Sequence, residues 1–390
     1  MVDPSSTKAI VIDNGSGMVK AGLGGEEKPR CVFPCVIGTP LQESVIPGGG
    51  KKDLYIGEEA QRLRGVLKIE YPIEHGIVKN WEMLTKIWEH AIVNEIRVES
   101  KECALMSTEA PLNPKKNREE MINIAFNHFG VKAFYVGIQA VLAMFSAGRT
   151  TGIVLDSGDG VTHTVPIYNT YSVPHAIKKV LLAGRDVSKH LEELLGERGW
   201  QTESTAQAQI IREIKEKLCY VSMNYQEDME SALGLMKPKD EARIKGWKEK
   251  NERVYTLPDG NLLNLGSERF RAPELMFQPT LAGKEILGIH KLTLASINEC
   301  DLDVRKDLWE NVILSGGNTV FENYPERLKK ELEALAPKAI QIKITAQTER
   351  KYAVFLGAAQ LASLSSFQSS WITKQQYDEE GDQIVHRMCF

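Results

Sequence analysis

One pattern occurs twice in this chain of 390 residues: an apolar run that ends in Asp, a Gly-rich turn, and a second short run. The first copy covers residues 9–22 (AIVIDNGSGMVKAG) and the second covers residues 152–163 (GIVLDSGDGVTH). Each apolar run predicts a buried strand, the glycines predict a turn that needs positive φ or close backbone approach, and the last run predicts a returning strand. Two such hairpins so far apart in the sequence indicate two similarly folded domains that face each other.

Helical patterns follow each hairpin, so we expect an α/β fold rather than an all-β fold. Two stretches carry apolar residues at helical spacing and are predicted to be helices that bury one face. These residues are Trp81, Leu84, Trp88, Ala91 and Ile92 in the first stretch, and Val187, Leu191, Leu194 and Leu195 in the second. A third helix is predicted to have Asn113 as its N-cap and Pro114 as its first residue. Residues 312–318 (VILSGGN) predict a strand and a Gly-rich turn, before a helix that begins near Pro325.

The composition is that of a globular protein, with 42% hydrophobic and 26% charged residues. The formal net charge of −4 gives no electrostatic reason to bind nucleic acid or an anionic membrane. No apolar run approaches the roughly 18 residues of a membrane span, and the first residues lack the pattern of a signal peptide. The six cysteines are scattered, which fits a reducing compartment. We therefore expect a cytoplasmic protein that neither binds nucleic acid nor inserts into a membrane.

The two Gly-rich turns have the residue types of a phosphate-binding site. Turns this short can bring backbone N–H groups against phosphate oxygens, and Ser16 and Lys20 would add a hydroxyl and a cation. Asp13 and Asp156 could hold a hydrated Mg²⁺, because this ion keeps several waters and needs only one or two carboxylates besides substrate phosphates. Either turn alone is more often an ordinary hairpin, and either Asp alone a turn former. The occurrence of both favours a phosphate clamp that closes from two sides.

Several other enzyme classes lack their motifs in this chain. There is no G-x-x-x-x-G-K-[ST] sequence of the P-loop NTPases, and residues 22–25 (GLGG) do not complete the dinucleotide-binding fingerprint. Neither H-E-x-x-H nor G-x-S-x-G occurs, which argues against zinc hydrolases and nucleophile-elbow hydrolases. Cys31 and Cys35 are close enough in the sequence to suggest a metal or redox site, but no second Cys/His pair has matching spacing.

Two stretches are predicted to be irregular. Residues 40–53 contain Pro47 and three consecutive glycines, which predicts an exposed, mobile loop. Residues 237–253 are rich in charged residues around Trp247. This charged segment is predicted to be a solvated insertion, with a docking site for an acidic partner as the alternative.

Together with their flanking residues, the two turns resemble the phosphate loops of actin, and further segments resemble actin in the same order. These segments are residues 71–76 (YPIEHG), 108–114 (TEAPLNP), 148–152 (GRTTG), 214–220 (IKEKLCY), 349–352 (ERKY), 371–375 (WITKQ) and 389–390 (CF). The resemblance runs from about Ile10 to the last residue and is broken mainly at 230–253. The sequence is therefore similar to the actin family over nearly its whole length.

The resemblance implies a fold of two similar lobes, as in actin, sugar kinases and heat-shock ATPases, each lobe a mixed sheet with flanking helices. Four subdomains would surround a central nucleotide cleft. Their residues would be 1–34, 72–146 and 353–390 for subdomain 1, 35–71 for subdomain 2, 147–182 and 285–352 for subdomain 3, and 183–284 for subdomain 4. The mobile loop 40–53 would belong to subdomain 2, and the charged insertion at about 230–253 to subdomain 4.

The resemblance also implies that ATP or ADP binds with Mg²⁺ or Ca²⁺. Asp13, Asp156 and Gln139 would surround the water shell of the metal ion and the attacking water. His163 would help to order that water, and hydrolysis would be slow because a Gln can orient water without being a strong base. For Gln139 alone the alternative is a buried, hydrogen-bonded amide, and for His163 alone a core histidine. The residues implied to bind the nucleotide are Gly15, Ser16, Gly17, Met18, Lys20, Asp159, Gly160, Val161, Gly184, Lys215, Glu216, Gly316, Gly317, Asn318, Val320 and Lys351.

Self-assembly into a filament is the function that the resemblance implies. The implied filament contacts are Gln42, Ile46 and Gly48 in the loop, and Leu281 and Lys284 in a segment similar to the hydrophobic plug of actin. Lys284 makes this segment more charged than in actin. Because burying a Lys without a partner costs several kcal/mol, we expect Lys284 to stay solvated or to pair across the contact.

We therefore expect a slowly hydrolysing ATPase that assembles into actin-like filaments, with the nucleotide controlling filament stability. Its partners would be further copies of itself and regulators similar to profilin, cofilin or gelsolin, at a cleft formed by Phe145, Tyr171 and Phe367. The alternative is a non-polymerising, actin-related subunit of a larger complex, favoured by the altered loop and the insertion. A metabolic kinase on the same fold would need a carboxylate base and a sugar pocket, and no residue singles one out.

Overall fold

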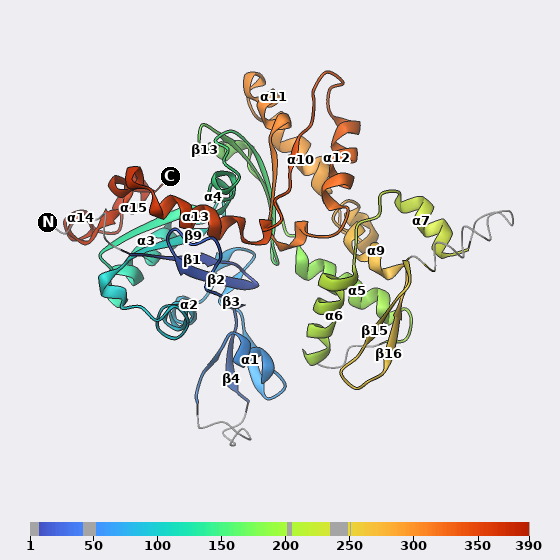
Figure 1. Ribbon diagram of the computed structural model, residues 1–390, viewed down its shortest axis with the longest axis horizontal. Coiled ribbons are helices and arrows are strands. Elements are labelled where there is room, and N and C mark those ends of the chain that lie inside the picture. The colour runs from blue at the N-terminus through green and yellow to red at the C-terminus, as the bar shows by residue number, and fades with distance from the viewer. Residues whose placement is uncertain (1–7, 42–51, 201–204, 235–248, 250, 390) are drawn as a thin grey trace.

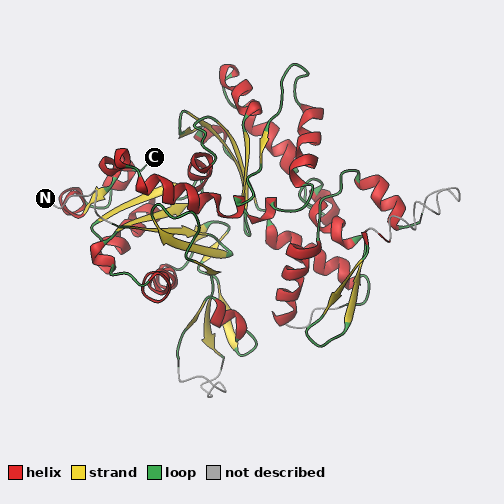
Figure 2. Cartoon of the chain, viewed as in Figure 1, coloured by secondary structure: helices red, strands yellow, loops and turns green. Residues whose placement is uncertain are grey.

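The computed structural model describes residues 8–41, 52–200, 205–234, 249 and 251–389. Figure 1 shows two lobes, one built from the N-terminal and C-terminal parts of the chain and the other from its middle part. Figure 2 shows that each lobe contains a sheet with helices packed around it. The fold is therefore mixed α/β, as the sequence predicts.

Strands and helices are interspersed along the chain. The described strands are β1 Ala9–Asn14, β2 Met18–Leu23, β3 Cys31–Pro34, β4 Ile37–Pro40, β5 Tyr55–Ile56, β6 Leu67–Glu70, β7 Ile73–Glu74, β8 Ile77–Val78, β9 Ala104–Glu109, β10 Ala133–Ile138, β11 Gly152–Ser157, β12 Thr162–Tyr168, β13 Tyr171–Ser172, β14 Lys178–Val180, β15 Arg253–Thr256, β16 Leu262–Leu265, β17 Val312–Ser315, β18 Ile344–Thr345 and β19 Ile372–Thr373. The described α-helices are α1 Glu58–Arg62, α2 Trp81–Glu89, α3 Lys115–Asn123, α4 Gln139–Ser146, α5 Gly184–Gly196, α6 Thr205–Leu218, α7 Tyr225–Ala232, α9 Glu268–Glu274, α10 Ile289–Asn298, α11 Leu302–Glu310, α12 Tyr324–Leu335, α13 Ala353–Ser363, α14 Lys374–Glu380 and α15 Ile384–Met388.

In the two large sheets, the strands that end near Asp13 and Asp156 have the same pattern of neighbouring strands. The first has the strand order β19-β10-β9-β1-β2-β3, and the second has the order β13-β12-β11-β17-β18, with β14 also paired to β12. β1 pairs antiparallel with β2 and parallel with β9, while β11 pairs antiparallel with β12 and parallel with β17. Both predicted hairpins are therefore confirmed. Their turns are called the first turn (residues 15–17) and the second turn (residues 158–161) below.

Each lobe has its own hydrophobic core. In the first lobe, β1, β9 and β10 pack with α2, α4 and α13, and Trp88 and Phe355 are fully buried. In the second lobe, β11 and β17 pack with α5, α10 and α12, and Leu191 and Tyr324 are fully buried. A small third cluster around Tyr55 holds β5, β6 and α1 together. The two sheets are thus rigid supports from which the first and second turns project.

The helices predicted from apolar spacing form, with one shift at a helix start. The first predicted stripe lies in α2 and in a π-helical continuation over His90–Ile96. The second stripe is buried in α5. α3 has Pro114 as its N-cap rather than Asn113, because the Asn113 side chain donates to Glu109 at 3.0 Å and accepts from Asn117 at 2.8 Å. α12 begins at Tyr324, and Pro325 occupies its first turn as predicted.

Both segments predicted to be irregular fall largely outside the described residues, which omit 42–51, 235–248 and 250. All six cysteines are free and buried. Burial raises the pKa of each thiol. The pKa reaches about 12 for Cys31, Cys35, Cys219 and Cys389. Within the described part of the chain, none of the helices has the length and apolar character that crossing a membrane requires.

Candidate functional site

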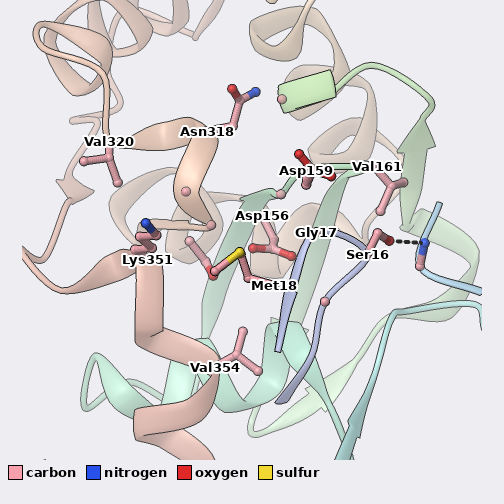
Figure 3. Close-up of a pocket in the computed structure, with 18 of the residues that line it drawn as sticks. Ser16, Gly17, Met18, Asp156, Asp159, Val161, Asn318, Val320, Lys351 and Val354 are labelled. Carbon is pink, nitrogen blue, oxygen red and sulfur yellow. Dashed lines mark hydrogen bonds between the residues drawn. The ribbon is translucent and has the colours of Figure 1, made fainter. Parts of the chain in front are cut away.

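A cavity between the two lobes is lined by both turns and by residues from α5, α6 and the segment after β17. All residues that the sequence analysis assigned to the nucleotide line this cavity, as do Asp13, Asp156 and Gln139. Figure 3 shows Asp156 between the two turns on one side and Lys351 and Val320 on the other. Residues that are far apart in the sequence are therefore brought to one site by the facing arrangement of the two hairpins.

The first turn is fixed by side chains of its own lobe. Asn14 Nδ2 donates to Ser107 Oγ at 2.8 Å, and Asn14 Oδ1 accepts from Trp88 Nε1 at 2.8 Å. Ser16 Oγ accepts from the backbone N–H of Gly76 at 2.9 Å, the dashed line in Figure 3. These bonds set the shape of the turn, so its backbone donors are preorganised.

Two glycines in the cavity wall leave no room for a side chain. A Cβ at Gly17 would lie 2.7 Å from Asp159 on the second turn. Gly316 has a φ of +90°, and a Cβ there would lie 2.2 Å from the carbonyl oxygen of Ser157. The backbone therefore approaches closely on both walls, as a phosphate-binding cradle requires.

Asp13 and Lys20 are partners in the β1–β2 register and form an ion pair at the cavity. Lys20 Nζ lies 2.8 Å from Asp13 Oδ2, and Thr108 Oγ1 donates to Asp13 Oδ1 at 2.8 Å. Burial on its own lowers the pKa of Lys20, but the charges of Asp13 and Asp156 outweigh burial and hold this pKa above its ordinary value. Lys20 therefore remains positively charged at neutral pH.

Asp13 and Asp156 are the carboxylates available for a cation. Burial raises the pKa of the Asp156 carboxyl, although the charge of Lys20 acts in the opposite direction. No cluster of three or more His, Cys, Asp or Glu side chains that could hold a metal ion occurs among the described residues. Two carboxylates beside a phosphate cradle fit Mg²⁺ or Ca²⁺ that keeps water and phosphate oxygens as further ligands, and they do not fit structural zinc.

Gln139 is the first residue of α4, and its amide is held close to Asp13. Gln139 Nε2 donates to the carbonyl oxygen of Asn14 at 3.0 Å, to Asp13 Oδ1 at 3.3 Å and to Thr108 Oγ1 at 3.3 Å. All three contacts use the nitrogen of the amide, so the carbonyl oxygen of the same side chain is the atom available to a ligand or water in the cavity.

His163 lies opposite Asp156 in the β11–β12 register, but it is not among the residues that line the cavity. Its side chain is 1% exposed, and its Nε2 has no hydrogen-bond partner among the described residues. Burial lowers the pKa of His163 to about 3, with a further contribution from the charge of Lys179. His163 is therefore a neutral, buried ring beside Asp156.

At the other end of the cavity, α6 contributes three charged residues. Lys215 is buried and its Nζ donates to the carbonyl oxygen of Gly184 at 2.9 Å, and burial lowers its pKa. Arg212 Nε donates to Glu216 Oε1 at 3.0 Å. The sequence analysis missed Arg212, although its position one helical turn before Lys215 and Glu216 was a usable signal. The other lining residues that it missed are Asn14, Gly76, Ser315, Phe321 and Val354.

The residues assigned to filament contacts are only partly described. Those outside the described residues are Gln42, Ile46 and Gly48. Leu281 is 40% exposed in the 3₁₀ turn Pro279–Ala282. Lys284 Nζ lies 2.5 Å from Asp186 Oδ1 of the same chain. Within its own chain Lys284 therefore has an acidic partner, while 35% of its side chain stays exposed, and its behaviour in a subunit contact stays a prediction.

The residues assigned to a cleft for regulators differ in exposure. Tyr171 is 58% exposed, whereas Phe145 is partly buried. Phe367 is buried, and its ring packs edge-on against Tyr135 and Trp371 at centroid distances of 4.9 and 5.5 Å. Phe367 therefore belongs to the core of the first lobe more than to its surface.

A comparison with protein families finds a match to the family model described as Actin over residues 5–390. The matched range includes both hairpins, the residues that line the cavity and the C-terminal helices. The match covers essentially the whole chain and agrees with the two-lobed α/β architecture, and we conclude that this chain belongs to the actin family.

Proposed function

We propose that this protein binds ATP and a divalent cation in the cavity between its lobes, hydrolyses the ATP slowly and assembles into actin-like filaments in the cytoplasm. Members of the actin family generally bind ATP or ADP with a divalent cation and are generally ATPases. The observation that carries the proposal is that two turns from equivalent hairpins line one cavity together with Asp13, Asp156 and Lys20.

The two turns would hold the phosphates from opposite lobes. Backbone N–H groups of the first and second turns, together with the hydroxyl of Ser16, would donate to phosphate oxygens. Lys20 keeps its charge because of Asp13 and Asp156, so it would supply the positive charge on the first lobe. A ligand with a chain of phosphates long enough to reach both turns fits this arrangement best.

Asp13 and Asp156 are the residues that would hold Mg²⁺ or Ca²⁺, with Gln139 acting through water. When bound, the cation would neutralise charge on the phosphates and orient them. The raised pKa of Asp156 reflects burial next to a second carboxylate, and the positive charge of a bound cation would lower this pKa again.

Hydrolysis would depend on the orientation of one water by Gln139. The Gln139 nitrogen is held by Asn14 and Asp13, so the carbonyl oxygen would accept a hydrogen bond from that water. An amide is a weak base, which makes the reaction slow. His163 is buried and neutral, so it would reach the water only after the cavity wall rearranges. Assembly that causes such a rearrangement would couple hydrolysis to the polymer.

The adenosine end would lie against α6 and the segment after β17. Lys215 and Glu216 from α6, and Val320 and Lys351 from the other side, line this part of the cavity. We also propose the division into four subdomains that the family resemblance implies, with the nucleotide at their meeting point. Tyr171, which is 58% exposed, would offer the accessible ring of the site for regulators similar to profilin, cofilin or gelsolin.

The test is sedimentation at several protein concentrations after addition of Mg²⁺, K⁺ and ATP, with phosphate release followed in the same samples. A working filament protein should pellet above a threshold concentration, and phosphate release should follow the pelleted fraction. Protein that binds ATP but stays in the supernatant at every concentration would contradict assembly and leave the nucleotide-binding part of the proposal intact.

A non-polymerising, actin-related subunit of a larger complex is the second candidate, and one observation favours it. The Lys284–Asp186 ion pair engages the plug-like segment within its own chain. If this segment stays so engaged, it is less able to contact a neighbouring copy. Sedimentation distinguishes the two candidates, because the second predicts a monomer that pellets only with partner proteins.

A further inference from the structure

One arginine side chain connects the two turns. Arg185, the second residue of α5, uses its Nε to donate to Asp159 Oδ2 on the second turn at 2.7 Å. Its Nη2 donates to the carbonyl oxygen of Ser16 on the first turn at 2.9 Å. Asp159 and Ser16 belong to different lobes, so a single planar guanidinium bridges the two lobes where their turns approach each other.

The second turn does not need this side chain for its attachment to α5. The backbone N–H of Gly184 donates to the carbonyl oxygen of Gly158 at 3.0 Å, and the backbone N–H of Arg185 donates to that of Asp159 at 2.9 Å. These two bonds remain in any Arg185 variant except proline. The side chain is therefore free to serve the connection to the first turn.

The orientation of the guanidinium is fixed by an aromatic ring. The Cζ of Arg185 lies 4.4 Å from the centroid of the Tyr71 ring. The same stretch of chain also contacts both turns, since His75 Nδ1 is 2.7 Å from the carbonyl oxygen of Gly160 and the N–H of Gly76 donates to Ser16. Stacking on Tyr71 restricts the guanidinium to the plane in which it reaches both acceptors.

Sterics show how tightly the turns are matched. A Cβ at Gly160 would lie 3.1 Å from the side chain of Ser16, and a Cβ at Gly17 would lie 2.7 Å from that of Asp159. The turns therefore approach so closely that these two glycines leave little room for a side chain, and a small shift would change which phosphate oxygens both turns can reach.

We propose that Arg185 is a positioning residue that sets the separation of the two turns, with Tyr71 holding its guanidinium in the bridging plane. This inference rests on the proposed function for its consequence, which is retention of the phosphates between the turns. The bridge between Ser16 and Asp159 itself does not depend on any ligand.

The experiment compares Arg185→Gln with a matched control, Arg271→Gln. Arg271 pairs with Glu197 at 3.3 Å at the opposite end of α5, so the control also removes one Arg from an ion pair with this helix. Hydrogen exchange is measured on the purified protein for peptides that contain the first turn, the second turn and the middle of α5. Dissociation of a fluorescent ATP analogue is measured in the same preparations by chase with unlabelled ATP.

For Arg185→Gln we expect exchange in the first turn to rise at least about fivefold while the middle of α5 stays unchanged, because the backbone bonds of α5 remain. The ATP analogue should dissociate about tenfold faster, a modest factor because Arg185 is 36% exposed on its side chain. Arg271→Gln should leave both quantities within about twofold.

Conservative variants separate positioning from general support. Arg185→Lys keeps the charge beside Asp159 but lacks the fork that reaches Ser16, so its first turn should behave as in Arg185→Gln. Tyr71→Leu removes the ring and should speed dissociation by about threefold, whereas Tyr71→Phe should not, since the ring face is retained. These variants also serve if Arg185→Gln does not fold.

Two results would overturn the inference. One is a first turn whose hydrogen exchange is unchanged in both Arg185 variants. The other is an exchange rate that rises equally in the first turn and in the middle of α5, or equally in Arg185→Gln and Arg271→Gln, which would mean that Arg185 only stabilises the helix. If the unmodified protein does not retain the ATP analogue but the exchange pattern is as expected, the proposed function fails and the bridging role stands.

Discussion

Lys284 Nζ lies 2.5 Å from Asp186 Oδ1, and the other carboxylate oxygen of Asp186 accepts from the backbone N–H of Ala183 at 2.9 Å. Asp186, the third residue of α5, thus binds the N-cap backbone of its helix and also anchors the segment that follows the 3₁₀ turn Pro279–Ala282. The next residue toward the N-terminus of α5 is Arg185, which bridges the two turns. The plug-like segment and the phosphate turns therefore share one helical turn as their support.

Replacement of Lys284 by Met should release this segment and lower the threshold concentration for assembly. The ion pair is partly exposed, 35% for Lys284 and 21% for Asp186, so we expect the free energy of unfolding to change by less than about 1 kcal/mol. Sedimentation measures the threshold. Lys86→Met, which removes an exposed pair with Glu89, is the control and should leave it unchanged. A threshold that rises in Lys284→Met would contradict the intrachain restraint.

Replacement of Gln139 by Ala should slow phosphate release at least about tenfold while the affinity for ATP changes less than about threefold. The reason is that the Gln139 amide is held by Asn14 and Asp13 and would orient the water rather than bind the nucleotide. Phosphate release is followed in assembled protein, and affinity by titration of a fluorescent analogue. Gln347→Ala removes an amide that donates to Ser146 away from the cavity, and it should have neither effect. Normal phosphate release in Gln139→Ala would remove this residue from the mechanism.

Replacement of Gly17 by Ala should weaken ATP binding at least about tenfold. The new Cβ would lie 2.7 Å from both Cβ and Cγ of Asp159, and because Cβ is attached directly to the backbone, the second turn itself must move. We expect about 1–3 kcal/mol of destabilisation as well. The control is Gly196→Ala at the end of α5, where a Cβ would meet no atom within 4 Å beyond its neighbours in the helix, and it should be neutral or slightly stabilising. Equal affinities in the two variants would show that the turns are not matched as closely as the contacts indicate.

The burial of His163 predicts a pH dependence of stability. Its pKa is about 3 in the folded protein and about 6.5 when unfolded, so the unfolded state binds more protons between these pH values. The stabilisation is complete above about pH 6.5 and is lost as the pH falls toward 3. Between pH 7 and pH 5 this group should cost about 2 kcal/mol of unfolding free energy.

The measurement compares urea unfolding of the unmodified protein and His163→Gln at the two pH values. The variant should lose about 2 kcal/mol less on going to pH 5. Asp156 has a raised pKa and works in the opposite direction, but it is present in both proteins and cancels in the difference. Identical losses in the two proteins would mean that His163 is protonated or solvated in the folded state.

Local patterns in the sequence were sufficient for the hairpins and for the cavity residues that lie in or next to their two turns, whereas the other predicted cavity residues came from the resemblance to the actin family. The register that pairs Asp13 with Lys20 and Asp156 with His163 follows from two apolar runs around short Gly-rich turns, which determine a hairpin almost on their own. The predicted start of α3 was wrong by one residue, because the Asn113 side chain hydrogen-bonds to Glu109 and Asn117 and does not cap the helix.

Long-range contacts could not be predicted in this way. Arg185 reaches Ser16 across 169 positions, and nothing in the residues next to Arg185 indicates that partner. The same holds for Lys284 and Asp186, which are 98 positions apart. The burial of His163 also depends on the packing of a whole sheet, so its pKa could not be inferred from its neighbours in the chain.

The buried cysteines allow local opening of the structure to be measured by thiol labelling. Cys31, Cys35, Cys103 and Cys389 belong to the core of the first lobe, and Cys219 and Cys300 to that of the second. Because burial both shields these thiols and suppresses their thiolates, an alkylating reagent can react only when the surrounding structure opens. The N–H of Cys35 donates to the carbonyl oxygen of Gly17 in the first turn at 3.0 Å. The rate at which the Cys35 thiol is labelled therefore reports how often the first turn opens, in protein that carries no added probe.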